Sequence, residues 1–194
     1  MKKIITISRE FGAGGGSIGQ LTAERLGYAF YDKELILETA KQSNLDVQEL
    51  ALYDEKVPVN FGFAQSLFDF YNKPLNERLF KAQKQVIQKI AEKGNCVIVG
   101  RNASSILKEY DYTLHVFIHA PSYYRIKRMK EQFPDMSEMQ LAEKLQSVDH
   151  ARKKYCAFYT DTVFGMASFY DLSINTEKIG IDTAVEIICS LAQK

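Results

Sequence analysis

Two hydrophobic patterns take turns along the chain, and their order predicts strands interleaved with helices. Short apolar runs rich in β-branched or aromatic residues indicate buried strands, whereas apolar residues three or four apart indicate amphipathic helices. The runs that predict strands lie at 4–7, 28–31, 96–99, 114–118 and 169–174. Helical spacing occurs at 18–26, where Ile18, Leu21 and Leu26 form the apolar stripe, and at 33–41, 74–93, 103–108, 123–131, 137–155 and 182–192.

This alternation predicts an α/β fold with a central parallel sheet and helices on both faces. A length of 194 residues suits one domain spanning 1–194. One stretch, at about 43–73, follows neither pattern, since it combines scattered acidic residues, Pro58 and several phenylalanines without a long period. We interpret it as a partly helical insertion that packs over a site.

A glycine-rich stretch joins the first predicted strand to its helix. Glycines let backbone N–H groups converge on an anion, and the N-terminus of a helix adds partial positive charge. The sequence therefore predicts a phosphate-binding loop, the alternative being a turn that only connects the two elements. Ser17 suits the N-cap of the helix or the role of hydroxyl ligand to a nucleotide-bound magnesium ion. The loop residues are Gly12, Ala13, Gly14, Gly15, Gly16 and Ser17.

The loop departs from the usual phosphate-binding pattern G-x-x-x-x-G-K-[ST]. When Ser17 is aligned with the hydroxyl residue, allowing one extra glycine before it, Gly15 stands where lysine is expected. Arg9 then stands in place of the first glycine. The loop consequently lacks the lysine that spans the β- and γ-phosphates.

Composition narrows the class of protein. Hydrophobic residues make up 46%, enough for a full core, and 25 basic against 24 acidic residues leave a net charge of +1. That balance argues against a nucleic-acid or membrane-surface binder. Cys96, Cys156 and Cys189 form no C-x-x-C pair, so we expect reduced thiols in a cytoplasmic protein, with neither disulfide nor zinc. The N-terminal apolar run is too short for a signal peptide or a membrane span.

Polar residues follow the predicted strands at their carboxyl ends, where open α/β sheets bind ligands. Arg9 follows the first strand, Asp32 the second, and Arg101 with Asn102 the third. Their coincidence predicts a single site. Asp32 and Asn102 also suit helix capping, and Arg101 also suits a plain surface charge, so these alternatives stay open.

Five motifs together resemble the cytidylate-kinase-like group of P-loop nucleoside monophosphate kinases. The resemblance implies a P-loop kinase fold with a monophosphate-binding insertion at about 43–73 and a mobile lid at about 125–155. It also implies transfer of a phosphoryl group from ATP, with Mg²⁺, to a nucleoside monophosphate, above all CMP or dCMP. The motifs are ISREFGAGGGSIG (7–19), YDKELI (31–36), VIVGRN (97–102), FIHAP (117–121) and DHARKKY (149–155).

The resemblance also assigns roles to residues of this chain. The loop would bind ATP, with Ser17 reaching magnesium through the nucleotide. Catalytic roles fall to Asp32, Arg128 and Arg152; acceptor binding to Arg101, Asn102 and Arg78; and lid roles to Arg125, Asp149 and Lys153. The plainer interpretation of the lid residues is a pair of solvated charged helices, with Asp149 and Arg152 paired at i, i+3.

Two other functions stay open. Because the loop lacks its lysine, the chain can be a nucleotide- or anion-binding module without turnover. It can also be a P-loop kinase that acts on another small metabolite. Partners would be nucleotide substrates, with no nucleic acid and no membrane; the sequence does not give the oligomeric state.

Overall fold

A parallel five-stranded sheet forms the centre of the computed structural model, which describes residues 3–32 and 73–194, with the backbone alone for 73–79. The strand order is β2-β3-β1-β4-β5, and all four pairings are parallel, which confirms the predicted α/β class. The strands are β1 (Ile4–Arg9), β2 (Ala29–Tyr31), β3 (Cys96–Val99), β4 (Thr113–His119) and β5 (Leu172–Asn175).

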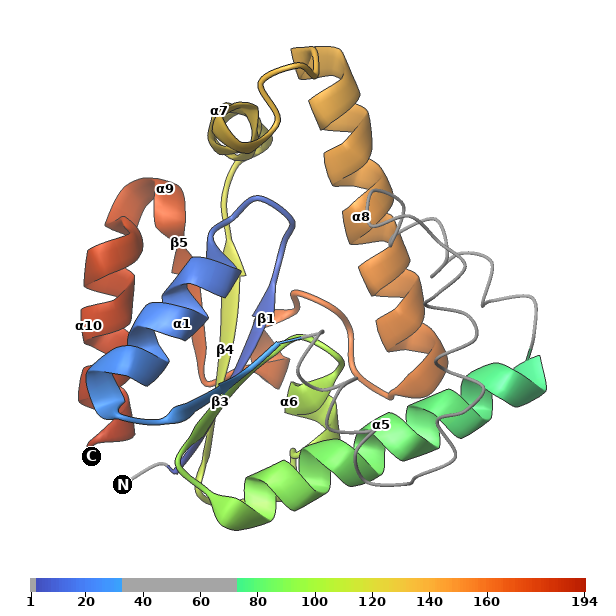
Figure 1. The fold of residues 1–194 in the computed structure, drawn as a ribbon, viewed down its shortest axis with the longest axis vertical. Coiled ribbons are helices and arrows are strands. Elements are labelled where there is room, and N and C mark those ends of the chain that lie inside the picture. Colours follow the sequence, from blue (N-terminus) through green and yellow to red (C-terminus); the bar gives the residue numbers. More distant parts are fainter. Residues whose placement is uncertain (1–2, 33–72) are drawn as a thin grey trace.

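Helices cover both faces of the sheet, as predicted (Figure 1). Ile5 and Ile7 of β1 face α1 and α10, whereas Ile4 faces α5 and α6, because successive strand side chains point to opposite faces. The helices are α1 (Gly15–Leu26), α5 (Lys73–Lys93), α6 (Ala103–Ile106), α7 (Ser122–Gln132), α8 (Glu138–Tyr159), α9 (Thr176–Ile179) and α10 (Ile181–Ala192).

Two details differ from the sequence prediction. Leu21, expected on the buried stripe of α1, is 38% exposed, and the helix buries Gly15, Ile18, Gly19, Thr22 and Ala23 instead. A Cβ at Gly19 would lie 2.6 Å from Cγ2 of Val99, so glycine lets α1 approach the sheet closely. The last strand begins at Leu172 rather than at 169, since residues 167–169 form a 3-10 turn.

The predicted insertion at 43–73 lies, apart from its last residue, outside the described residues.

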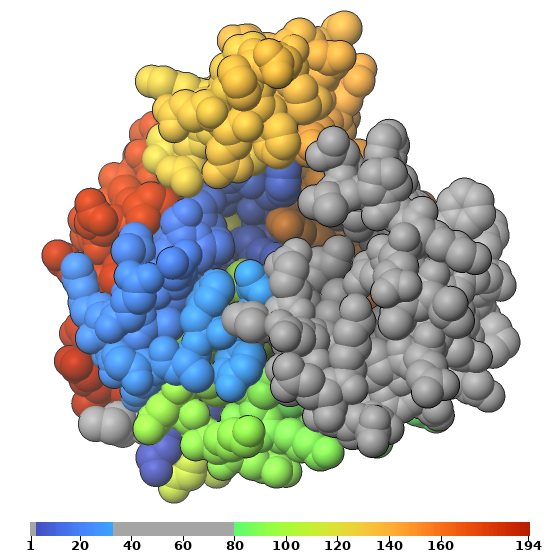
Figure 2. Space-filling model, in the orientation of Figure 1, coloured from blue at the N-terminus to red at the C-terminus, as the bar shows by residue number. Residues whose placement is uncertain are grey.

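The helices α7 and α8 form a hairpin near the carboxyl ends of the strands (Figure 1). In Figure 2 the segment that contains α7, coloured yellow, overhangs the N-terminal segment, coloured dark blue. The hairpin has a small core of its own, made by Met129, Leu141 and Leu145, against which Phe11, the residue before the glycine loop, packs. The hairpin therefore shares its core with the loop, which positions the two relative to each other.

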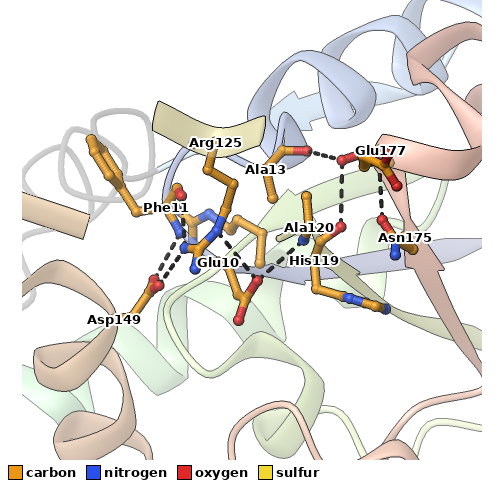
Figure 3. Close-up of polar contacts among 12 residues, drawn as sticks. Glu10, Phe11, Ala13, His119, Ala120, Arg125, Asp149, Asn175 and Glu177 are labelled. Atoms are coloured by element: carbon orange, nitrogen blue, oxygen red, sulfur yellow. Dashed lines mark hydrogen bonds and ion pairs between the residues drawn. The ribbon is translucent and has the colours of Figure 1, made fainter. Parts of the chain in front are cut away.

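A buried ion pair joins the two helices of this hairpin. Nη1 of Arg125 on α7 lies 2.5 Å from Oδ2 of Asp149 on α8, and both residues are over 90% buried. The other oxygen of Asp149 accepts a hydrogen bond from the backbone N–H of Phe11 at 2.8 Å. Figure 3 shows Arg125 between Asp149 and Glu10, whose Oε2 lies 3.6 Å from Nε of Arg125.

This arrangement corrects one part of the plainer interpretation of the lid charges, their exposure to solvent. Asp149 pairs closely with Arg125 across the hairpin and also forms the predicted i, i+3 ion pair with Arg152, at the longer distance of 3.9 Å. Removing one partner of a buried pair leaves the other charge without compensation in a site that excludes water. The pair is therefore a structural link between α7, α8 and the loop, not a solvated charge run.

We predict that Asp149→Asn lowers the free energy of unfolding by roughly 2–4 kcal/mol, because it leaves the Arg125 guanidinium buried without its main carboxylate. Urea unfolding measures the effect as a lower midpoint at an unchanged slope.

The control variant is Arg25→Met. It breaks the exposed pair between Arg25 and Glu186, at 3.9 Å, which we expect to contribute less than about 1 kcal/mol. Equal losses in the two variants would show that the pair under the hairpin has no special structural weight.

Candidate active site

The glycine loop runs from the end of β1 into α1 through two left-handed residues, Gly12 (φ 79°) and Gly14 (φ 90°). Gly14 is the N-cap, so the prediction of Ser17 as N-cap is wrong; Ser17 is the third residue of α1 and is exposed. The first-turn amides of Gly15, Gly16 and Ser17 have no acceptor among the described residues, as is usual at a helix N-terminus.

Every backbone carbonyl from residue 9 to residue 14 accepts a hydrogen bond from a donor of the protein. Three of the donors are guanidinium groups: Arg152 binds O of Arg9 at 2.9 Å, Arg125 binds O of Phe11 at 3.1 Å, and Arg128 binds O of Gly12 at 3.2 Å. The other acceptors are Glu10, bonded by the amide of Ala13; Ala13, bonded by the hydroxyl of buried Thr176; and Gly14, bonded by the amide of Ile18.

The carbonyl oxygens, which are the negative ends of the loop's peptide dipoles, are therefore already hydrogen-bonded within the protein. Carbonyl oxygens that faced a bound anion would repel it, whereas converging N–H groups attract it. A loop whose carbonyls are all satisfied by protein donors and whose first-turn amides have no acceptor among the described residues is suited chemically to hold a phosphate.

The charges around the loop favour the same ligand. Among the described residues, the guanidinium groups of Arg9, Arg125, Arg128 and Arg152 lie at or beside the loop, together with the carboxylates of Glu10 and Asp149. Burial lowers the pKa of Arg152 to about 10, although Asp149 opposes the shift, so its charged form is destabilised while remaining protonated at neutral pH. An anion at the loop would relieve that destabilisation.

A left-handed turn follows β3, the strand beside β1 in the sheet. Gly100, Arg101 and Asn102 have φ values of 80°, 56° and 54°, a conformation that costs about 1–2 kcal/mol for each residue with a side chain. Arg101 is half-buried, and its guanidinium has no ion-pair partner in the part of the chain that the structure describes. Backbone strain of this kind is typical of functional positions.

Two residues that hold this turn were missed by the sequence analysis. Nε2 of Gln83, on α5, donates to O of Arg101 at 3.0 Å and to the hydroxyl of Tyr155, on α8, at 3.1 Å. Asn102 caps α6 by position but without a side-chain cap bond; its Nδ2 lies 3.4 Å from O of Tyr155. A signal existed for Gln83, since it stands three residues before Val86 and seven before Ile90 and therefore lies on the apolar face of α5.

The remaining predicted residues are less closely grouped. Asp32 directly follows β2, whose Tyr31 pairs with Ile98, so Asp32 lies beside the end of β3. Lys153 is exposed on α8 and makes no contact with the loop among the described residues. Arg78 lies on α5, where its side chain is outside the described part of the structure.

Ser17 is the residue predicted to reach magnesium through the nucleotide. Within residues 3–32 and 73–194, no group of three His, Cys, Asp or Glu side chains is placed to hold a metal ion. Mg²⁺ commonly takes few protein ligands together with phosphate oxygens and water, which suits an exposed Ser17 hydroxyl on the first turn of α1. Among the described helices, none has the length and apolar character needed to cross a membrane.

Comparison with solved structures shows the fold of P-loop kinases. A crystal structure of an uncharacterized protein from Eubacterium ventriosum ATCC 27560 shares 27% identity, with 98% of each chain covered and a TM-score of 0.75. Shikimate kinase from Bacteroides thetaiotaomicron shares 15% identity over 98% of each chain, with a TM-score of 0.56. Shikimate kinase from Aquifex aeolicus shares 22%, covering 97% of this chain and 95% of its own, with a TM-score of 0.51.

Comparison of the sequence with protein families agrees with the fold. No curated protein matches the sequence. The family model described as the cytidylate kinase-like family matches residues 4–178, which include the glycine loop, the turn after β3 and the α7–α8 hairpin. With a match over most of its length, the chain belongs to the cytidylate kinase-like family.

Proposed function

We propose that the protein transfers the γ-phosphoryl group of ATP to a nucleoside monophosphate, with CMP or dCMP as the acceptor. The observation that carries this proposal is the glycine loop whose carbonyls from residue 9 to residue 14 all accept protein donors, three of them guanidinium groups. An oxygen of the acceptor's phosphate would attack the γ-phosphorus, and the bond to the β-phosphate oxygen would break, so that ADP leaves.

The two halves of this reaction suit different parts of the site. The loop residues 12–17 would bind the phosphates of ATP, with magnesium held by those phosphates and Ser17. Arg128 and Arg152 would neutralise charge on the transferring group, since both already donate to the loop. Arg125 and Asp149 would act by positioning these helices, because the two form a buried ion pair with each other.

Acceptor binding would fall to the segments that follow the carboxyl ends of β2 and β3. Arg101, held on its left-handed turn, offers a planar guanidinium for the acceptor's phosphate or base. Asn102 and Arg78 are the further candidates of this half. Asp32, at the end of β2, would orient the acceptor or hold magnesium through water.

Two observations favour other functions. Gly15 stands in place of the loop lysine, which favours nucleotide binding without turnover. The structural likeness to shikimate kinases favours a kinase with another small acceptor.

A coupled assay for ADP release tests these functions against one another. We expect CMP or dCMP to raise the rate well above that without acceptor, in a panel that includes UMP, AMP and shikimate. Binding of MgATP without acceptor-dependent ADP release would favour the binding module, and a rate raised by shikimate alone would favour the other kinase.

We predict that Arg101→Ala weakens CMP binding roughly tenfold to a hundredfold, because it removes a charge-assisted contact of about 1.5–3 kcal/mol. Calorimetry should show an unchanged affinity for MgATP, since Arg101 follows β3 and not the glycine loop.

Lys108→Met is the matched control. Lys108 is an exposed cation that follows the short helix α6, whereas Arg101 precedes that helix. Equal weakening of CMP and MgATP by Arg101→Ala would mean that the two halves of the site are assigned the wrong way round. Loss of the fold would make Arg101 structural.

We also predict that MgATP slows amide hydrogen exchange in residues 125–155, because phosphates would bridge the loop and the arginines of the hairpin. Mass spectrometry of the exchanged protein measures this, with α10 as the internal control. Slowing of equal size in both segments, or in neither, would remove the hairpin from the mechanism.

A further inference from the structure

The sequence exchanges two residue types between two positions of the phosphate-binding pattern. In G-x-x-x-x-G-K-[ST] the first glycine and the lysine are six residues apart. Arg9 and Gly15 are also six residues apart, but here the cation comes first and the glycine second. The last glycine of the pattern, Gly14, keeps its place as the left-handed N-cap of α1.

Packing explains why the two positions exchange together. A Cβ at Gly15 would lie 2.5 Å from Cβ and 2.8 Å from Cγ of Arg9, closer than real Cβ contacts come. These two Arg9 atoms are next to its backbone and cannot swing away as the end of a flexible side chain does. A side chain at position 15 and the arginine at position 9 therefore exclude each other.

A second glycine makes room for the far end of Arg9. A Cβ at Gly100 would overlap Nη1 of Arg9 and would lie 2.8 Å from its Cζ. The Arg9 side chain thus runs from the first turn of α1 to the left-handed turn after β3, which carries Arg101. That course takes its guanidinium from the proposed ATP half of the site to the proposed acceptor half.

The backbone of Arg9 is fixed from two sides. Arg9 is the last residue of β1 and pairs with Ile118 of β4, and the amide of the next residue, Glu10, donates to O of Ile118. Its own carbonyl accepts the bond from Arg152. Arg128, whose guanidinium lies against Gly14, instead belongs to α7 of the hairpin.

We propose that Arg9 supplies, from the end of β1, the phosphate-binding cation that a P-loop ordinarily supplies from the first turn of its helix. The inference rests on the proposed function, because the ligand is the polyphosphate of a nucleotide. An arginine suits the longer reach, since its planar group can donate to two phosphate groups at once. Gly15 and Gly100 then serve the same purpose, since each leaves room for a part of the Arg9 side chain.

Calorimetry with MgATP and thermal unfolding together test the proposal on four variants. Arg9→Met keeps the stem and removes the charge, and we expect it to weaken MgATP binding roughly tenfold to a hundredfold. Arg9→Lys should recover part of that loss. Gly15→Lys alone should lower the unfolding temperature, whereas Arg9→Gly combined with Gly15→Lys should restore both that temperature and MgATP binding.

The control is Arg25→Met, which removes an arginine from the last turn of α1 and should change neither measurement beyond a small loss of stability. If Arg9→Met binds MgATP as wild type does, the role of Arg9 is overturned while the proposed function stands. If wild type binds no MgATP, the proposed function fails and the phosphate role of Arg9 fails with it. A Gly15→Lys variant as stable as wild type would overturn the exclusion between the two positions.

Discussion

Each backbone carbonyl between Arg9 and Gly14 needs a hydrogen-bond donor, and the placement of α7, α8 and α9 follows from where those donors come. A loop of this kind buries peptide groups that no sheet or helix satisfies, and unsatisfied buried carbonyls are costly. Arginines of the hairpin supply three donors and a threonine of α9 supplies one. The loop keeps its shape because residues far away in the sequence donate hydrogen bonds to its carbonyls.

The same constraint limits how the hairpin can move. Arg125 and Arg128 lie on α7 and Arg152 lies on α8, so a rigid swing of both helices would strip donors from the loop and expose the pair with Asp149. The connection between the helices, which includes Pro134, carries none of these bonds. Movement on ligand binding is therefore expected at the far end of the hairpin, while its base stays with the loop.

The sequence predicts most of the sheet but little of what holds the site together. Strands were predictable because buried parallel strands are uninterrupted apolar runs, and the site's edge followed from polar residues at the strand ends. The predicted apolar stripe of α1 was wrong at Leu21, which is exposed, because the helix buries Gly19 and Thr22 instead. The bond from Gln83 to Arg101 and the packing of Arg9 on Gly100 join residues far apart in the chain, and no local pattern encodes them.

The left-handed turn after β3 has a consequence for how this family changes. At positions 101 and 102 the backbone conformation suits glycine better than the residues present, so substitution to glycine would ease folding. Wherever selection for the arginine is lifted, drift at this turn favours glycine. Under the proposed function, the residue at position 101 then separates relatives that still recognise a phosphorylated acceptor from relatives that keep only the scaffold.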